Sequence, residues 1–139
     1  MVELRIEIDG DVDKPTIDRA MTILGELVIN KVKANIRTID LIQKGDFLQG
    51  WFSKWTGNTL FIENMRKYAL YLEYGTYAYF DIYGEDSYTE PVHPKKRDMS
   101  PQMKRSFPRG MQPFAPVRRV LYNDAIMEGL IDQAFKAAV

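Results

Sequence analysis

Apolar residues recur at helical spacing over a long stretch near the N-terminus, and this pattern constrains the fold more than any other feature of the chain. They are Ile17, Met21, Leu24, Val28, Val32 and Ile36. Steps of three or four residues place them on one face of an α-helix, which we predict from about Lys14 to Arg37, with Pro15 in its first turn. Gly25 lies inside this helix and costs it up to about 1 kcal/mol relative to alanine. We therefore expect close packing at Gly25, against a sheet or the other long helix.

A second amphipathic stretch occupies the C-terminal part of the chain. Its apolar residues are Val117, Val120, Leu121, Leu130, Ile131, Ala134, Phe135 and Ala138. Their spacing predicts a helix from about Pro116 to Ala138 with one apolar stripe. We expect both long helices to pack on a small antiparallel sheet.

Two segments have the patterns of β-strands. Near the N-terminus, Val2, Leu4, Ile6 and Ile8 alternate with charged residues, which predicts a half-buried strand. Residues 51–63 predict a hairpin that turns at Gly57-Asn58. Pairing across this turn places four residues on one face, which we expect to pack in the core: Trp51, Trp55, Leu60 and Ile62.

The second face of this hairpin is only half polar. It carries Phe52, Lys54, Phe61 and Glu63. A sheet with one solvated face would leave that face polar throughout. We therefore expect Phe52 and Phe61 to be covered, either by the C-terminal helix or by a neighbouring subunit.

The chain between the hairpin and the last helix is less regular in pattern. Residues 64–73 favour a short helix, with Asn64 as its N-cap and Gly75 as its stop. Extended chain near residues 74–83 is expected to add to the sheet. Residues 77–110 hold four of the seven prolines and no sustained periodicity, which predicts a long irregular loop.

Composition narrows the class of protein. At 139 residues the chain can bury a substantial core, and we predict a single α+β domain over residues 1–139. Nineteen basic and nineteen acidic residues leave no net charge, which argues against a dedicated nucleic-acid binder. The absence of cysteine excludes disulfides and thiol catalysis. The alternating start is unlike a signal peptide, and no apolar run approaches the roughly 20 residues that span a bilayer. We expect a soluble intracellular domain with no membrane partner.

No group of residues has the pattern of a catalytic or metal site. Asp9, Asp11 and Asp13 imitate the start of a calcium-binding loop, but the required glycine and glutamate are absent from its sixth and twelfth positions. His93 is the only histidine and has no readable nucleophile or acid partner. We predict no catalytic residue, no metal ligand and no cofactor, and hence no enzyme. A hydrolase that uses His93 and Glu73 is the weakest alternative.

Tyrosines are concentrated in one part of the chain. Seven of the eight fall between Tyr68 and Tyr88. Some of them, at helical spacing, are expected to pack on the core, but one short helix cannot bury seven. Tyrosine offers a large rigid contact area with one polar group, which suits a protein–protein surface. The aromatic residues assigned to a subunit or partner interface are Phe52, Phe61, Tyr74, Tyr77, Tyr79, Phe80, Tyr83 and Tyr88.

Charge is segregated within the predicted loop. Residues 81–90 carry four acidic residues and no basic one, whereas residues 95–109 carry six basic residues and one acidic. Three interpretations stay open: contact with DNA, pairing of the basic stretch with the acidic stretch of the next subunit, and a solvated loop. The basic residues assigned to the candidate interface are Lys95, Lys96, Arg97, Lys104, Arg105 and Arg109.

Two further segments carry a family resemblance. Residues 68–76 read Tyr-Ala-Leu-Tyr-Leu-Glu-Tyr-Gly-Thr, and residues 113–116 read Pro-Phe-Ala-Pro before the last helix. With the N-terminal helix and the step Gly45-Asp-Phe-Leu48, this order of segments resembles the small tail-completion, or neck, proteins of long-tailed bacteriophages. The resemblance covers roughly residues 15–76 and 110–138. Its motif residues are Tyr68, Ala69, Glu73, Gly75, Thr76, Pro113, Phe114 and Pro116.

The resemblance implies a structural role in the virion. Proteins of this family join the tail tube to the head connector or complete the tail, commonly as a hexameric ring. The implied partners are further copies of the chain, a head connector or stopper protein, and a tail-tube or tail-terminator protein, and DNA can lie in the lumen of such a ring. A nucleic-acid-binding module that uses the basic residues 95–109 is the alternative.

Overall fold

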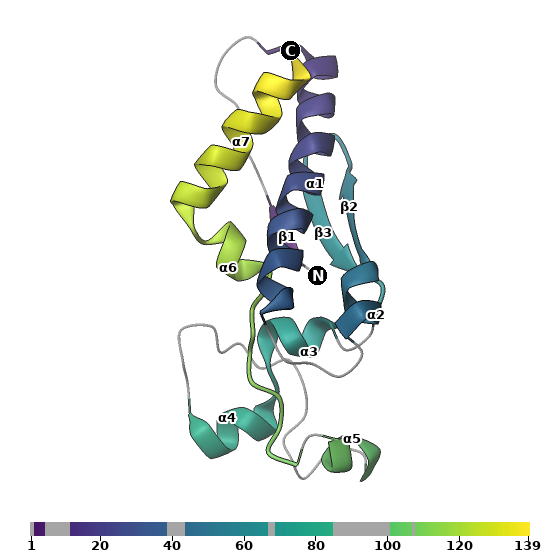
Figure 1. The fold of residues 1–139 in the computed structure, drawn as a ribbon, viewed down its shortest axis with the longest axis vertical. Coiled ribbons are helices and arrows are strands. Elements are labelled where there is room, and N and C mark those ends of the chain that lie inside the picture. Colours follow the sequence, from purple (N-terminus) through teal and green to yellow (C-terminus); the bar gives the residue numbers. More distant parts are fainter. Residues whose placement is uncertain (1, 5–11, 39–43, 67–68, 85–100, 107) are drawn as a thin grey trace. The chain divides into compact units, whose positions relative to one another are not determined.

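The computed structural model of the chain describes residues 2–4, 12–38, 44–66, 69–84, 101–106 and 108–139 (Figure 1). The chain divides into two compact units. Unit 1 comprises residues 1–66 and 116–139, and unit 2 comprises residues 67–115. This division does not test whether the chain folds as one domain, which stays a prediction.

A small antiparallel sheet lies in unit 1. Its strands are β1 (Val2–Leu4), β2 (Trp51–Trp55) and β3 (Leu60–Asn64), in the order β1-β3-β2. The hairpin register agrees with the sequence pattern, because Trp55 pairs with Leu60 and Ser53 with Ile62. A hydrogen bond from the Thr56 N–H to the Thr59 carbonyl, at 3.1 Å, closes the two-residue turn.

Helix α1 (Lys14–Arg37) packs on β2 and β3, and its bounds are those that the apolar spacing predicts (Figure 1). Gly25 makes the closest approach to the sheet. A Cβ atom there would lie 2.5 Å from Ser53 Oγ and 3.3 Å from Leu60 Cδ1. The predicted close packing at Gly25 is therefore confirmed, and its partner is the sheet.

The predicted helix 116–138 is wrong as one continuous element. It is divided into α6 (Arg118–Leu121) and α7 (Asp124–Ala138). Asn123 lies between them in an extended conformation, and its Oδ1 accepts a hydrogen bond from the Ile126 N–H at 3.2 Å. A side chain that caps a new helix in this way ends the previous one. Helix α7 then packs along α1, beside it in Figure 1.

Helix α2 (Lys44–Gln49), which was not predicted from the sequence, contains the step Gly45-Asp-Phe-Leu48. It carries Phe47, which is buried and whose ring lies 5.5 Å from that of Trp51. The expected N-cap at Asn64 is wrong. Asn64 ends β3, its Nδ2 donates to the Phe47 carbonyl at 2.9 Å, and its Oδ1 accepts from the Arg66 N–H at 2.8 Å.

Unit 2 contains three short helices: α3 (Ala69–Tyr74), α4 (Tyr77–Tyr83) and α5 (Pro101–Ser106). The expected strand near residues 74–83 is therefore wrong. Aromatic residues favour strands only weakly, because that preference depends on the sheet surface around them. Here Thr76 takes an extended conformation at the N-cap position, and Gly84 ends α4 with φ 77°. Gly75, also at φ 77°, follows α3 as predicted.

The predicted irregular loop is only partly irregular, because α4 and α5 lie within residues 77–110. Residues 85–100 and 107 lie outside the described residues. The fold class is confirmed as α+β: a small antiparallel sheet with two long helices in the same unit.

Candidate assembly surface

The structure joins the two motif segments of the sequence. The Phe114 and Ala115 N–H groups donate to the Leu72 carbonyl at 2.8 and 3.2 Å. The Thr76 N–H donates to the Met111 carbonyl at 3.0 Å, and the Met111 N–H donates to Thr76 Oγ1 at 3.0 Å. Residues 72–76 therefore hold residues 111–115 alongside them. Most of these contacts use backbone atoms, so no side-chain pattern in the sequence pointed to the pairing.

Gly75 and Pro113 form the closest contact between these segments. A Cβ atom on Gly75 would lie 3.0 Å from both Cδ and N of Pro113. The φ of 77° at Gly75 also favours glycine. Ala115 takes φ 48°, an uncommon conformation for a residue with a side chain, and it is fully buried. The Gly-Thr and Pro-Phe-Ala-Pro motifs thus have a structural role in shaping this contact.

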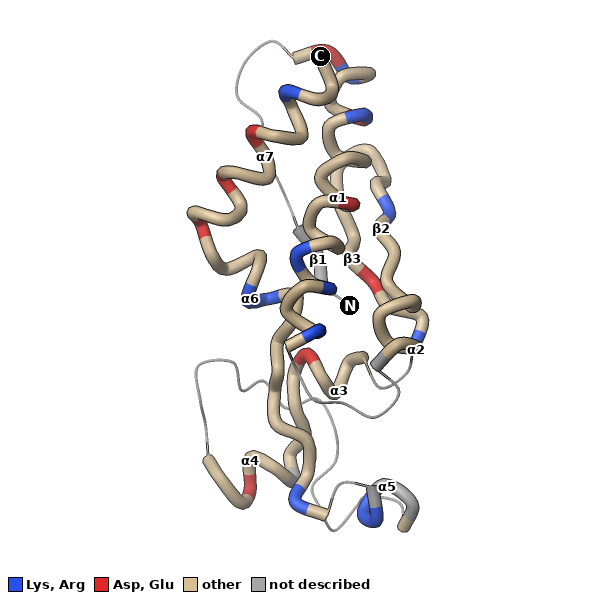
Figure 2. The backbone as a smooth tube through the Cα atoms, in the orientation of Figure 1, with Lys and Arg blue, Asp and Glu red and all other residues tan. Residues whose placement is uncertain are grey.

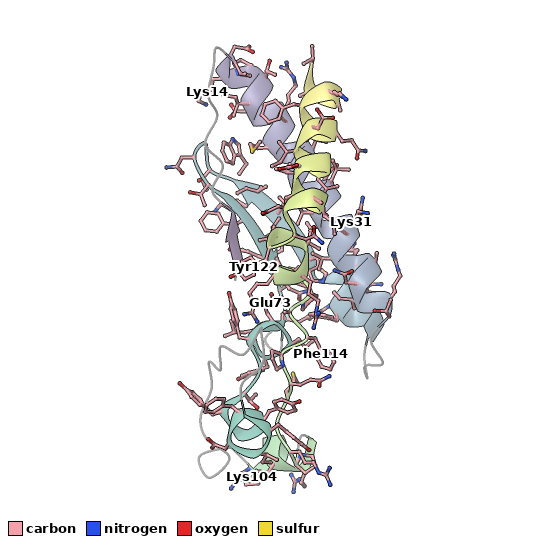
Figure 3. The ribbon with its side chains drawn as sticks, turned by 90° about the vertical axis from the view of Figure 1, so that its left-hand side faces the viewer. Lys14, Lys31, Glu73, Lys104, Phe114 and Tyr122 are labelled. Carbon is pink, nitrogen blue, oxygen red and sulfur yellow. The ribbon has the colours of Figure 1, made fainter. Side chains whose placement is uncertain are left out.

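The remaining motif residues are also mostly covered. Glu73 is 3 % exposed. Figure 3 labels Glu73, on α3, and Phe114, in the segment 111–115 that pairs with residues 72–76. Pro113 and Pro116 are buried, and Ala69 and Phe114 are half-buried. Tyr74, which was assigned to the interface, is half-buried as well. The Pro116 carbonyl accepts a hydrogen bond from Asn35 Nδ2 of α1 at 3.4 Å. Tyr68 lies outside the described residues.

Helix α4 presents the exposed aromatic part of unit 2. Tyr77 is 36 % exposed, Ile82 46 % and Tyr83 50 %, while Tyr79 and Phe80 are half-buried. The Tyr79 and Tyr83 rings lie 4.6 Å apart. The sequence pattern identified these aromatic residues as a candidate interface but missed Ile82, since it treated the segment as extended chain rather than as a helix.

Exposed basic residues also lie in unit 2. Arg109 Nη1 donates to Tyr83 Oη at 3.4 Å, and Arg109, Lys104 and Arg105 are all exposed. Figure 2 shows basic residues on α5 and an acidic one, Asp81, on α4, and Figure 3 labels Lys104. Within the described part of unit 2, Asp81 is the only exposed acidic residue. The exposed side chains Tyr77, Ile82 and Tyr83 of α4, Lys104 and Arg105 of α5, and Arg109 are together called the α4–α5 surface below.

Several residues assigned to the interface or to chemistry are not placed. Tyr88, Lys95, Lys96, Arg97 and His93 lie outside the described residues, as do the acidic residues of 85–90. The possible pairing of the acidic and basic stretches therefore stays a prediction. Among the residues that the structure does describe, no group of three or more His, Cys, Asp or Glu side chains is arranged to hold a metal ion.

The second face of the sheet lies opposite α1. Phe52 is 38 % exposed on this face, and Phe61 beside it is half-buried. The C-terminal helix does not cover them, because α7 packs on α1 and α1 packs on the other face. Of the two expected covers, the C-terminal helix is therefore wrong and the neighbouring subunit stays a prediction.

One carboxylate in unit 1 has a shifted pKa. Trp55 Nε1 donates to Asp18 Oδ1 at 2.8 Å, and Lys14 Nζ lies 3.2 Å from Asp18 Oδ2. The indole hydrogen bond, followed by the one from Lys14, lowers the pKa of Asp18 from its usual value. This contact joins the first turns of α1 to β2, which is a structural role.

Taken together, the described surfaces define an α+β protein with exposed aromatic and basic contacts. Comparison with protein-family models, with curated proteins and with solved structures finds no match. Across the described helices, none combines the length and apolar character that crossing a membrane requires.

Proposed function

We propose that the protein is a structural component of a bacteriophage tail that joins or completes the tail at the head–tail interface, assembling as a ring with connector and tail-tube proteins. The resemblance of residues 15–76 and 110–138 to tail-completion proteins supports this class. The observation that carries the assembly role is the α4–α5 surface, where Tyr77, Ile82 and Tyr83 are exposed and Tyr83 bonds to Arg109. Tyrosine and arginine are enriched at protein interfaces, and clustered exposed apolar side chains mark contact sites.

The pairing of residues 72–76 with 111–115 supports the same role. It fixes the start of α4 through Thr76 and the segment after Arg109 through Met111. A contact surface held in one conformation loses less entropy when it binds. On this proposal the motif residues hold the two segments in one conformation, and the neighbouring exposed residues contact the partner protein.

The test replaces exposed side chains of α4 without changing the motif residues. The double substitution Ile82→Ser and Tyr83→Ser is expected to abolish tail completion when the protein is mixed with the connector and tail-tube proteins of its phage. Removal of two central contacts costs about 2–4 kcal/mol at a typical interface, which is roughly 30- to 1000-fold in affinity. The matched control is Tyr122→Ser, which removes a tyrosine that is 63 % exposed but lies in unit 1 (Figure 3).

Tail completion is scored by electron microscopy of joined particles and by infectious titre. Full completion by the Ile82→Ser/Tyr83→Ser protein would contradict the assembly role of the α4–α5 surface. Equal loss in the Tyr122→Ser control would show that the effect does not belong to α4.

A nucleic-acid-binding role is the second candidate, and one observation favours it. Arg109 is exposed and bonds to the exposed Tyr83, and Lys104 and Arg105 of α5 are exposed as well; basic side chains grip phosphates, and aromatic ones stack on bases. A gel-shift titration with single-stranded and duplex DNA over a range of salt concentrations tests this role. Binding that weakens steeply with salt and is lost in Lys104→Glu/Arg105→Glu would support it, and no binding at low salt would exclude it.

A further inference from the structure

The face of the sheet opposite α1 carries a compact arrangement of two apolar and two charged side chains. Lys54 pairs with Phe61, and the next pair on this face is Phe52 with Glu63. The four side chains therefore form a block in which the two phenylalanines lie on one diagonal and the two charges on the other. Met65 continues the same face beyond Glu63, since its N–H extends the ladder to the Gly50 carbonyl at 3.0 Å, and it is 69 % exposed.

The described helices of unit 1 do not cover this block of four side chains. Ser53 alternates with Phe52 and Lys54 along β2, and Ser53 faces Gly25 of α1. Trp55, on the same side as Ser53, bonds to Asp18 of α1. Since α7 packs on α1, both long helices lie on that side, and Figure 1 shows α1 in front of the strands with α7 beside it. Phe52 remains 38 % exposed.

We propose that the same face of a second copy of this chain covers the block. The block is complementary to itself. Consider a two-fold axis that runs parallel to the sheet, along the diagonal from Phe52 to Phe61. Such an axis stacks the phenylalanines of one copy on those of the other, and it brings Lys54 over the other copy's Glu63 at two equivalent places.

Other two-fold arrangements match the block poorly. An axis along the strands, or across them, places each charged side chain on a phenylalanine of the other copy. An axis along the charged diagonal places Lys54 on Lys54 and Glu63 on Glu63, which is repulsive. The favoured diagonal is inclined to the strands, so the two sheets cross, as they do in orthogonally packed sheets. Apolar stacking and charge pairing therefore select the same arrangement.

The contact is isologous, so it closes on two copies and cannot by itself build a ring. It uses unit 1 alone and does not depend on the proposed function, whose contacts lie in unit 2. The block is small compared with the roughly 800 Å² per partner of a stable interface. We therefore expect a weak dimer, with a dissociation constant on the order of 10–100 μM.

The test is a charge exchange measured by sedimentation velocity of the full chain, from about 5 to about 500 μM, a range that brackets the expected affinity. Lys54→Glu and Glu63→Lys, each alone, place like charges together and are expected to weaken dimerisation about tenfold or more. An equimolar mixture of these two variants is expected to form a heterodimer as stable as the wild-type dimer, because every facing pair is again of opposite sign. Mass spectrometry under native conditions identifies the mixed species.

The mixture of the two variants distinguishes a contact between two copies from a change within one copy. Lys54 and Glu63 are diagonal neighbours within the chain, so each substitution also alters its own sheet, and mixing cannot repair that. The matched controls are Lys31→Glu on α1 and Glu128→Lys on α7, both exposed on the helices of the other side, and they are expected to dimerise like the wild type. Circular dichroism verifies that each variant is folded.

Three outcomes would overturn the proposal. The first is a wild-type protein that stays monomeric over the whole concentration range. The second is a pair of single variants that self-associate as the wild type does. The third is a mixture in which no heterodimer forms although both variants are folded. A failure of tail completion in the Ile82→Ser/Tyr83→Ser protein has no bearing on these results, because that protein keeps the block intact.

Discussion

Thr76 and Met111 bond to each other twice, although 35 residues separate them. The Thr76 N–H donates to the Met111 carbonyl, and the Met111 N–H donates to the Thr76 hydroxyl, both at 3.0 Å. Thr76 occupies the N-cap position of α4 but makes no side-chain bond to that helix. Its hydroxyl instead accepts a hydrogen bond from the buried Met111 N–H, so Thr76 links the two motifs rather than capping the helix.

Replacement of Thr76 by valine should therefore destabilise the protein. Valine keeps the shape but leaves the Met111 N–H without an acceptor in a site where Thr76 is 2 % exposed. A buried unsatisfied donor costs about 1–3 kcal/mol. Urea titration measures the free energy of unfolding, and Thr76→Ser, which keeps the hydroxyl, is the control. If valine and serine give equal stabilities, the hydroxyl bond is unimportant.

Gly25 and Gly129 should respond in opposite directions to alanine. Both lie inside helices, where alanine is better than glycine by up to about 1 kcal/mol. A Cβ on Gly129 meets nothing within 4 Å, so Gly129→Ala should stabilise the protein. At Gly25 the Cβ would lie 2.7 Å from the Cβ of Ser53, and overpacking of this kind costs about 1–3 kcal/mol. The measurement is the sign of the change in unfolding free energy in urea. A stabilised Gly25→Ala protein would show that α1 and β2 are not in close contact at Gly25.

Gly75 combines a positive φ with a close contact. At φ 77° a residue with a side chain is strained by about 1–3 kcal/mol, and a Cβ on Gly75 would lie 3.0 Å from Cδ and N of Pro113. Gly75→Ala should therefore lower the thermal midpoint. The control is Gly129→Ala, whose Cβ meets nothing within 4 Å and which should not lower it. A wild-type midpoint for Gly75→Ala would show that neither the backbone conformation nor the Gly75–Pro113 contact requires glycine.

The Asp18 carboxylate should make stability depend on acid pH. Its pKa is lowered in the folded protein, first by the Trp55 hydrogen bond and then by Lys14. A group with a depressed folded pKa stabilises the protein above its unfolded pKa, near 3.9, and that stabilisation is lost as the pH falls through the folded pKa. Asp18→Asn should therefore flatten the decline in unfolding free energy below about pH 4.

Trp55→Phe provides the second arm of this experiment. It removes the indole N–H while leaving the carboxylate, so it should reduce the same acid dependence, and the double variant should add little to either single one. Acid profiles of wild type and Asp18→Asn that run parallel would rule out this contribution.

Periodic patterns in the sequence predicted the parts of the fold that bury one face. The bounds of α1 and the register of the hairpin follow directly from where the apolar residues recur, because burial of one face fixes both. Gly25 was also predictable as a packing site, since an unfavourable helix residue needs a compensating contact. These features depend on local spacing alone.

Features set by single contacts between distant residues were not predictable in this way. Asn123 divides the last helix through one side-chain hydrogen bond, although the apolar stripe continues past it. Residues 77–83 form a helix despite their aromatic content. The pairing of residues 72–76 with 111–115 uses mostly backbone groups, which every residue possesses, and one threonine hydroxyl. The sequence thus identified the two motifs, but not that they meet.

Unit 1 consists of two stretches of chain that are far apart in sequence, and α7 packs along one side of α1. During synthesis on a ribosome, residues 14–37 emerge long before residues 124–138 exist. Until those later residues are made, the side of α1 that will meet α7 has only solvent or a chaperone to contact. Contacts of such long range form late and slowly. Truncation within the last helix should therefore leave a nascent protein that is recognised by quality control, even though every residue of the sheet has already been translated.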